Sequence, residues 1–322
     1  MKLAYYNDFI PGVVLGDRIV DIHRVVEGLP HRDRQDLMPE LIARFDTLRA
    51  SIDAHVARAE SLALDSVTLR APLPRPRQID CMAVNYMEDG TLPAPPAING
   101  FHKSPGAIIG PGETFVLPDE PAIVFEGEAE LGIVIGRRAT HVAAKDAMAH
   151  IFGYVNFIDG SARGLPPANN VIFLAKSRDT FAPIGPYIVT ADEIADPQNL
   201  EIKLSVNGAV KQHFNTSDMA HKIPRCIEWL SALHTLEPGD LVATGTNHRG
   251  LSALQDGDRV ELEIEGLGRL AVNVRDDLQR TWPRDTRAEN SRRFTEQTGE
   301  AAPTTGVPSK QTGGKYAPGE RS

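Results

Sequence analysis

Three carboxylates on two strand-like segments carry the strongest chemical signal in this sequence. Residues 125–136 end in a β-branched apolar run closed by glycine, which predicts a buried strand. Glu128 and Glu130 are two positions apart and therefore share one face, about 7 Å from each other. Asp159 ends a second such segment. The acids either point into solvent at a strand end or bind a hard cation such as Mg²⁺ or Mn²⁺, which accepts a few carboxylates and keeps positions for water and substrate.

The order of several motifs resembles that of the fumarylacetoacetate hydrolase family. That family pairs a Glu-x-Glu-Leu-x-x-Val-Ile-Gly strand, present here at 128–136, with a later Gly-Tyr…Asp-x-Ser-Ala-Arg segment, present at 153–163. Further matching segments follow at 176–186, 206–208 and 238–246, so the resemblance covers roughly residues 75–276. It implies that Glu128, Glu130 and Asp159 are ligands of Mg²⁺ or Mn²⁺.

The resemblance also implies roles for residues beside the metal. Lys176 would stabilise a developing enolate or move a proton. Thr246 and the adjacent Gly245 backbone would bind the substrate's carboxylate, and Tyr154 is a further candidate for substrate binding. Arg163 would contact a substrate carboxylate or brace its own loop, and the sequence favours neither role.

A feature of the family's hydrolases is missing at its usual position. Relatives that hydrolyse C–C bonds follow an Asn-Tyr pair with a His and, three residues on, a Glu, and this dyad activates water; here Asp89 and Leu92 stand at those positions. Three residues are candidate substitutes for the base: Asp89, if its surroundings raise its pKa toward neutrality, His102 and His248. His102 and Lys103 point in opposite directions along an extended segment, so at most one faces a site.

The predicted function is a divalent-metal-dependent hydrolase. By the resemblance, it would cleave a C–C bond of an acylpyruvate-like or 1,3-dicarbonyl 2-oxo acid through a metal-bound enolate, as in the catabolism of aromatic compounds. Because the dyad is missing, the alternative is an isomerase, decarboxylase or other lyase that uses the same enolate without activated water. A third hypothesis is a ligand-binding relative that has lost its activity. It does not explain why the three acids are retained, since their mutual repulsion would only destabilise a protein that does not use them.

Composition and charge indicate an ordinary globular protein. The 322 residues have a formal net charge of −9 without a cluster of basic residues, which argues against nucleic-acid binding. No apolar run is long enough to span a membrane and no signal-peptide core is visible, so the expected location is cytoplasmic. The two cysteines have no metal-site or disulfide-framework spacing. The family resemblance implies a homodimer.

The chain divides into three predicted parts. Residues 1–72 form a small α+β domain, residues 73–278 form a catalytic domain with the family's mixed β-roll, and residues 279–322 form a low-complexity tail, giving an α+β, β-rich protein. Apolar residues three or four apart predict amphipathic helices within 36–62 and 223–236. Because residues 285–322 have almost no aliphatic side chains, the tail is expected to be disordered or to dock onto a partner subunit.

Overall fold

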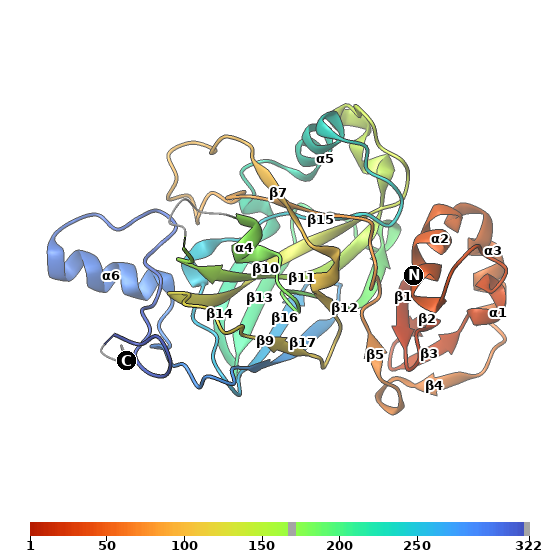
Figure 1. The fold of residues 1–322 in the computed structure, drawn as a ribbon. Coiled ribbons are helices and arrows are strands. Elements are labelled where there is room, and N and C mark those ends of the chain that lie inside the picture. The colour runs from red at the N-terminus through yellow and green to blue at the C-terminus, as the bar shows by residue number, and fades with distance from the viewer. Residues whose placement is uncertain (167–171, 319–322) are drawn as a thin grey trace.

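Two β-sheets form the body of the computed structural model, which describes residues 1–166 and 172–318 (Figure 1). Twelve strands make the larger sheet. Its order is β4 (Ser61–Ala63), β3 (Arg18–Asp21), β2 (Ile10–Leu15), β1 (Lys2–Tyr6), β12 (Ala182–Thr190), β11 (Ile151–Arg163), β10 (Val124–Ile135), β15 (Leu241–Ala243), β6 (Ile79–Met82) and β7 (Gly100–Lys103), with β5 (Leu69–Arg70) paired to β1 and β8 (Ile108–Ile109) to β12. The smaller sheet has the order β14 (Ala209–Asn215), β13 (Glu201–Val206), β16 (Arg259–Ile264), β17 (Arg269–Arg275) and β9 (Thr114–Val116).

Helices lie around these sheets and cover little of the sequence. The N-terminal region contains α1 (His23–Val26), α2 (Leu37–Ala43) and α3 (Phe45–Val56), and the rest of the described chain contains α4 (Ile172–Lys176), α5 (Ile223–Leu233) and α6 (Arg287–Thr298). The predicted β-rich α+β fold and the amphipathic helices are therefore confirmed. Within the described residues, every helix is too short or too polar to cross a membrane.

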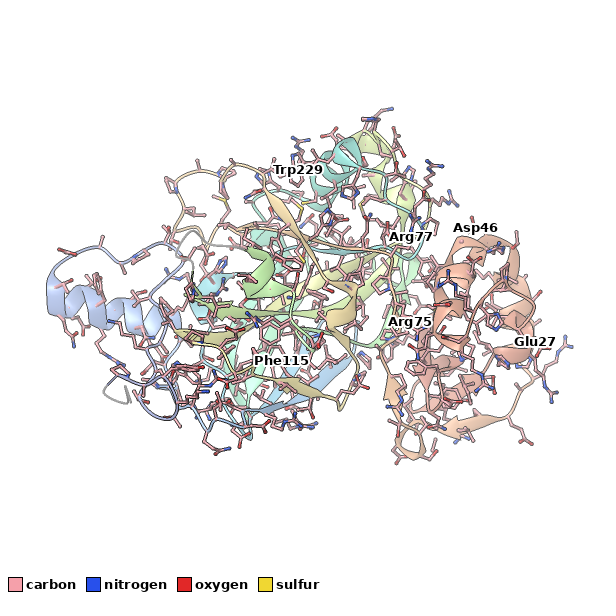
Figure 2. The ribbon with its side chains drawn as sticks, viewed as in Figure 1. Glu27, Asp46, Arg75, Arg77, Phe115 and Trp229 are labelled. Atoms are coloured by element: carbon pink, nitrogen blue, oxygen red, sulfur yellow. The ribbon has the colours of Figure 1, made fainter. Side chains whose placement is uncertain are left out.

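The N-terminal elements form a lobe beside the body, joined by a segment that carries Arg75 and Arg77 (Figure 2). The lobe is not separated from the body by solvent, because β1 pairs with β12 and extends the large sheet. Phe45 of α3 also packs edge-on against Phe152 of β11, with ring centroids 5.0 Å apart. Whether residues 1–72 fold as an independent domain stays a prediction.

The centre of the large sheet holds the acids. β10 and β11 pair antiparallel, and Glu128 lies directly opposite Asp159 in their register. All twelve residues of β10 are buried, as its β-branched run predicts. Gly160 of β11 lies against the ring of Phe115 from the smaller sheet, because a Cβ at Gly160 would lie 2.6 Å from that ring. Phe115 is labelled in Figure 2. Because the two sheets pack closely here, the acidic side chains of β10 lie inside the protein.

The C-terminal residues form ordered structure, which corrects the expectation of a disordered tail; docking onto a partner subunit stays a prediction. α6 begins with a capping box between Thr286 and Glu289 and ends at Gly299 in the left-handed conformation. Arg287 is 6% exposed, and its Nη2 lies 2.5 Å from the Glu126 carboxylate of β10. The tail is indeed poor in aliphatic residues, but it docks onto its own chain through a buried ion pair, which an apolar count does not reveal.

We expect Arg287→Met to destabilise the protein by about 2 kcal/mol. Breaking a buried ion pair costs about 3–5 kcal/mol, but Arg163 still neutralises Glu126 from 3.0 Å and reduces the loss. Urea denaturation measures the difference. Lys315→Met is the matched control, because the pair of Lys315 with Asp119 is exposed and worth under about 1 kcal/mol. Equal unfolding free energies for the two variants would refute this account of how the tail is held.

Candidate active site

The three predicted metal ligands converge in the interior. One carboxylate oxygen of each of Glu128, Glu130 and Asp159 lies within 4.8 Å of the others. All three side chains are buried, with at most 5% of each residue exposed. Alternation along β10 places the two glutamates on one face, and the β10–β11 register places the aspartate opposite them. The alternative of a solvated strand end is thus wrong for these acids.

Two lysines meet the same acids. Lys176 at the end of α4 places its Nζ 2.6 Å from Glu128 and 2.5 Å from Asp159. Lys103 of β7 reaches the other oxygen of Asp159 at 2.5 Å. Lys176 was predicted as a site residue from the sequence, and Lys103 was missed. Strand alternation predicted only that Lys103 and His102 point in opposite directions, so that at most one of them faces a site.

The guanidinium of Arg163 links two strand acids. Its Nε lies 3.0 Å from Glu126, and its Nη2 donates to Glu128. Its side chain is 26% exposed and contributes to the wall of the adjacent cavity. Arg163 therefore braces the acids and also has a surface available to a ligand, so both predicted roles remain compatible with its position.

The electrostatics single out Glu130. Burial, followed by the charges of Asp159 and Glu128, raises the pKa of Glu130 well above its usual value. Burial also opposes the ionisation of Glu128, but the charges of Lys176 and Arg163 outweigh it and hold the pKa of Glu128 well below the usual range. Lys176 stays protonated, because the carboxylates of Asp159 and Glu128 raise its pKa against the effect of burial.

These residues fit a hard divalent cation. Among the described residues no basic side chain forms an ion pair with Glu130, whose Oε2 accepts only a backbone hydrogen bond from Gly245, at 2.7 Å. A cation bound by the three carboxylates would supply the missing positive charge, and its donors would all be oxygen, as Mg²⁺ and Mn²⁺ prefer. The donor set is thus suited to the predicted metal.

The segment after β15 positions this group. Gly245 has φ +90°, and a Cβ there would lie 2.9 Å from Asn85, so the turn requires glycine. Thr246 follows, but its hydroxyl donates to the carbonyl of Ala129 at 2.8 Å and accepts from Gln212 at 2.9 Å. Thr246 is only 1% exposed. Its observed contacts are those of a structural residue, and its predicted carboxylate-binding role stays a prediction.

A histidine–glutamate pair lies beside the acids, although the usual dyad is missing from the sequence. Nδ1 of His248 lies 2.6 Å from Oε1 of Glu88, and the His248 amide donates to Oε2 at 2.9 Å. Glu88 is fully buried and His248 is 8% exposed. Because a carboxylate only accepts hydrogen bonds, Nδ1 carries the proton and Nε2 keeps its lone pair. This is the arrangement of a general base with its orienting acid.

The loop backbone determines which acid takes this position. Glu88, Asp89 and Gly90 all have positive φ, between 55° and 72°, a tight conformation that turns consecutive side chains to different sides. Asp89 points outward: its side chain is 57% exposed and accepts from Asn247 at 2.8 Å. The expectation that Asp89 acts as base is therefore corrected, and Glu88, which the motif comparison passed over, is the acid that faces inward.

Two further sequence candidates lie outside this group. His102 is on the opposite face of β7 from Lys103 and contacts Asp80, with its Nδ1 3.1 Å from Oδ1. Tyr154 is 1% exposed within the hydrophobic core, and burial raises the pKa of its hydroxyl. It lies five residues from Asp159, about 16 Å along β11 at the usual rise per residue. Neither side chain faces the acids, so both expectations are wrong.

A cavity of about 530 Å³ opens beside the acids. Charged and polar side chains on its wall are Glu128, Arg163, Lys176 and His248. The apolar part of the wall consists of Ala83, Val84, Phe101, Ile123, Ala162, Leu165, Ile172 and Ala175. One end can thus recognise an anionic, oxygen-rich group while the rest accommodates a less polar one.

The fold and the site define a class of β-rich proteins in which three buried acids could hold a divalent cation. The fumarylacetoacetate hydrolase C-terminal family model matches residues 80–275. This chain belongs to the fumarylacetoacetate hydrolase family, as the sequence motifs had indicated.

Relatives of known structure or activity perform different reactions. Mitochondrial oxaloacetate tautomerase from Bos taurus is 40% identical over 264 residues, which cover 79% of this chain and 82% of that protein. Maleylpyruvate hydrolase from Sphingobium, crystallised with manganese(II) and pyruvate, is 37% identical with a TM-score of 0.78, covering 86% of this chain and 99% of the other. A 5-carboxymethyl-2-hydroxymuconate delta-isomerase from Mycobacterium smegmatis has 31% identity and a TM-score of 0.68, covering 86% and 100%. The family alone therefore does not assign the reaction.

Proposed function

We infer that this protein is a divalent-metal-dependent hydrolase that cleaves a C–C bond in an acylpyruvate-like or related 1,3-dicarbonyl 2-oxo acid. The observation that carries this proposal is the His248–Glu88 pair, because the absence of a dyad was the main argument against hydrolysis. His248 shares one cavity wall with Glu128 and Lys176. A candidate base (His248), a positively charged side chain (Lys176) and one of the candidate metal ligands (Glu128) therefore face the same cavity.

Each group has a distinct role in the proposed reaction. A Mg²⁺ or Mn²⁺ ion held by Glu128, Glu130 and Asp159 would act as a Lewis acid toward the oxygens of a 2-oxo acid. Lys176, kept protonated by its carboxylate neighbours, donates a hydrogen bond to the oxygen on which negative charge develops. Nε2 of His248 accepts a proton from water, and Glu88 holds the ring in the required tautomer.

The bond changes balance without a further reactant. The water oxygen bonds to the distal acyl carbon, and the bond between that carbon and the neighbouring methylene breaks. The electron pair passes to the pyruvate fragment, which is protonated at its methylene carbon, so the products are a carboxylic acid and a 2-oxo acid. Arg163 faces the cavity and is suited to the distal polar group of the substrate, while Phe101 and Leu165 offer it apolar contacts.

Tautomerisation of a 2-oxo acid is a second candidate. The bovine relative named as an oxaloacetate tautomerase favours it. The same imidazole could carry a proton between the carbon and the oxygen of the substrate, with no water consumed. The two proposals differ in their products.

We expect metal-dependent formation of two acids from acetylpyruvate or fumarylpyruvate. The experiment compares these substrates and oxaloacetate with Mn²⁺, with Mg²⁺ and with EDTA, and follows substrate loss and product identity by proton NMR. Keto–enol exchange of oxaloacetate without cleavage of any acylpyruvate would replace the hydrolase by the tautomerase. No metal-dependent reaction of any of the three would contradict both proposals. Homodimer formation and a cytoplasmic location stay predictions.

A further inference from the structure

A second group of potential metal ligands lies on the other side of the β6–β7 pair. Asp80 of β6 lies directly opposite His102 of β7 in the antiparallel register. Lys103, the next residue along β7, reaches Asp159 in the candidate active site. Because neighbouring strand residues face opposite sides, Asp80 and His102 point away from that site.

Helix α5 covers this opposite side and brings a third ligand. Trp229 of α5 lies next to β7 (Figure 2), and a Cβ at Gly100 would lie 3.0 Å from its ring, so the helix approaches the strand closely. The chain leaves α5 at His234 in an extended conformation, with φ −154°. Nε2 of His234 then lies 3.2 Å from Oδ1 of Asp80.

The three side chains are arranged around one point. Oδ1 of Asp80 is 3.1 Å from Nδ1 of His102, and one potential ligand atom of each residue lies within 4.8 Å of the others. The two imidazole centroids are 5.3 Å apart. Asp80 is 2% exposed, and its Oδ2 is buried without a hydrogen-bond partner among the described residues. A buried carboxylate oxygen with no partner is costly and points to an additional ligand.

We propose that Asp80, His102 and His234 form a second metal site, selective for a divalent cation of the zinc class. Ligands about 2.0 Å from a tetrahedral zinc are separated from each other by about 3.3 Å, close to the two distances from Asp80. Two imidazoles and a carboxylate suit Zn²⁺ or Co²⁺, whereas the all-oxygen site of Glu128 favours Mg²⁺ or Mn²⁺. The site is distinct from the candidate active site in position and in donor chemistry.

The surroundings hold the ligands in the required form. Nδ1 of His234 lies 3.4 Å from both the carbonyl oxygen of Thr235 and the amide nitrogen of Gln78. Donation from Nδ1 to the carbonyl is the tautomer that leaves the lone pair of Nε2 for a metal. The side chain of His102 is 64% exposed and that of His234 28% exposed, which gives a cation access from solvent. Three protein ligands leave a fourth position for water or for an external ligand.

A hydrogen-bonded cluster without metal is the competing explanation. In that case, Asp80 would only bridge two imidazolium rings. It would still leave Oδ2 without a partner, whereas a metal bound by Asp80 can use that oxygen as well. The two explanations differ in whether the residues bind zinc or cobalt in solution.

The test uses the full-length protein after removal of metal by EDTA and dialysis. Equilibrium dialysis counts bound Zn²⁺, and visible absorption follows Co²⁺, whose four-coordinate sites with imidazole ligands absorb more strongly than six-coordinate oxygen sites. The variants are His102→Ala with His234→Ala, the single variant His102→Gln, and the control His213→Ala. His213 also pairs with a carboxylate, that of Glu201 at 3.0 Å, but among the described residues it belongs to no group of three potential metal ligands.

We expect the double variant to bind one zinc ion fewer than the wild-type protein and to lose the strong cobalt absorption, while His213→Ala retains both. His102→Gln, whose side chain is mostly exposed and tolerant of change, should weaken zinc at least about tenfold and serves if the double variant does not fold. Unchanged zinc stoichiometry in the folded double variant, or wild-type protein without the strong cobalt absorption, would overturn the proposal.

Discussion

Glu130→Gln should abolish metal-dependent turnover and at the same time stabilise the metal-free protein. Glu130 is one of three carboxylates in the candidate metal site, and an amide is a much poorer ligand for a hard cation. Loss of Lewis-acid catalysis is worth several kcal/mol, so kcat/KM is expected to fall at least about 10³-fold. Without metal, the wild-type protein buries a carboxyl group that has no cationic partner among the described residues.

The stabilisation has a definite pH dependence. The pKa of Glu130 is raised by burial and by the neighbouring acids, so the folded protein binds this proton more tightly than the unfolded chain. Stability is therefore complete below the unfolded pKa of about 4.3 and is lost as pH rises from there toward the raised folded pKa. The advantage of the glutamine variant should grow across this window and reach roughly 1–3 kcal/mol.

Thermal unfolding in EDTA and in Mn²⁺ measures both effects. In EDTA at neutral pH the variant should unfold at the higher temperature. With Mn²⁺ at 1,000 times its Kd the wild type gains about 4.1 kcal/mol, more than the advantage of the variant, and the order reverses. Glu263→Gln, on the exposed part of β16, is the control and should change neither property. Identical Mn²⁺ stabilisation of Glu130→Gln and wild type would remove Glu130 from the metal site.

His248→Asn should lower the rate of C–C hydrolysis by about 10²–10⁴-fold, the usual contribution of a general base. Glu88 orients the imidazole without reaching the substrate, so Glu88→Gln should cost less, about 10- to 100-fold. Because the two residues act as a unit, the double variant should be no slower than His248→Asn alone. Asp89→Asn is the control, and its exposed side chain predicts a change within about threefold.

The readout separates a catalytic role from a structural one. Single-turnover rates should fall in His248→Asn while substrate affinity and Mn²⁺ affinity stay near wild type, because the histidine lies outside the three-acid group. A variant that keeps the wild-type single-turnover rate would exclude His248 as the base, and a large loss in Asp89→Asn would restore the original interpretation of that loop.

Much of the site follows from local sequence. A strand period of two residues places Glu128 and Glu130 on one face wherever β10 lies, and the apolar run that follows predicts its burial. The motif containing Asp159 then indicates the third acid. These features are properties of short contiguous segments, which is why they could be predicted before the structure was known.

The tertiary structure decided which distant groups meet. Glu88 and His248 are 160 residues apart, and the inward position of Glu88 rather than Asp89 depends on the positive φ angles of one loop. Strand alternation determined that His102 and Lys103 diverge, but the tertiary fold determined that the Lys103 side chain reaches Asp159 of β11. Such contacts depend on how separate elements pack, and a local pattern contains no information about that packing.

The C-terminal residues also show what the local sequence predicts and what the fold decides. Their composition predicts correctly that residues 285–322 have little apolar surface to bury. Their docking includes the ion pair of Arg287 with Glu126, a strand acid more than 160 positions earlier that the sheet has buried. The sequence by itself determined the strands, their faces and the candidate metal ligands. The fold decided the position of the proposed base, the contact of the second lysine and the docking of α6, because each depends on a charge or a lone pair presented by another part of the chain.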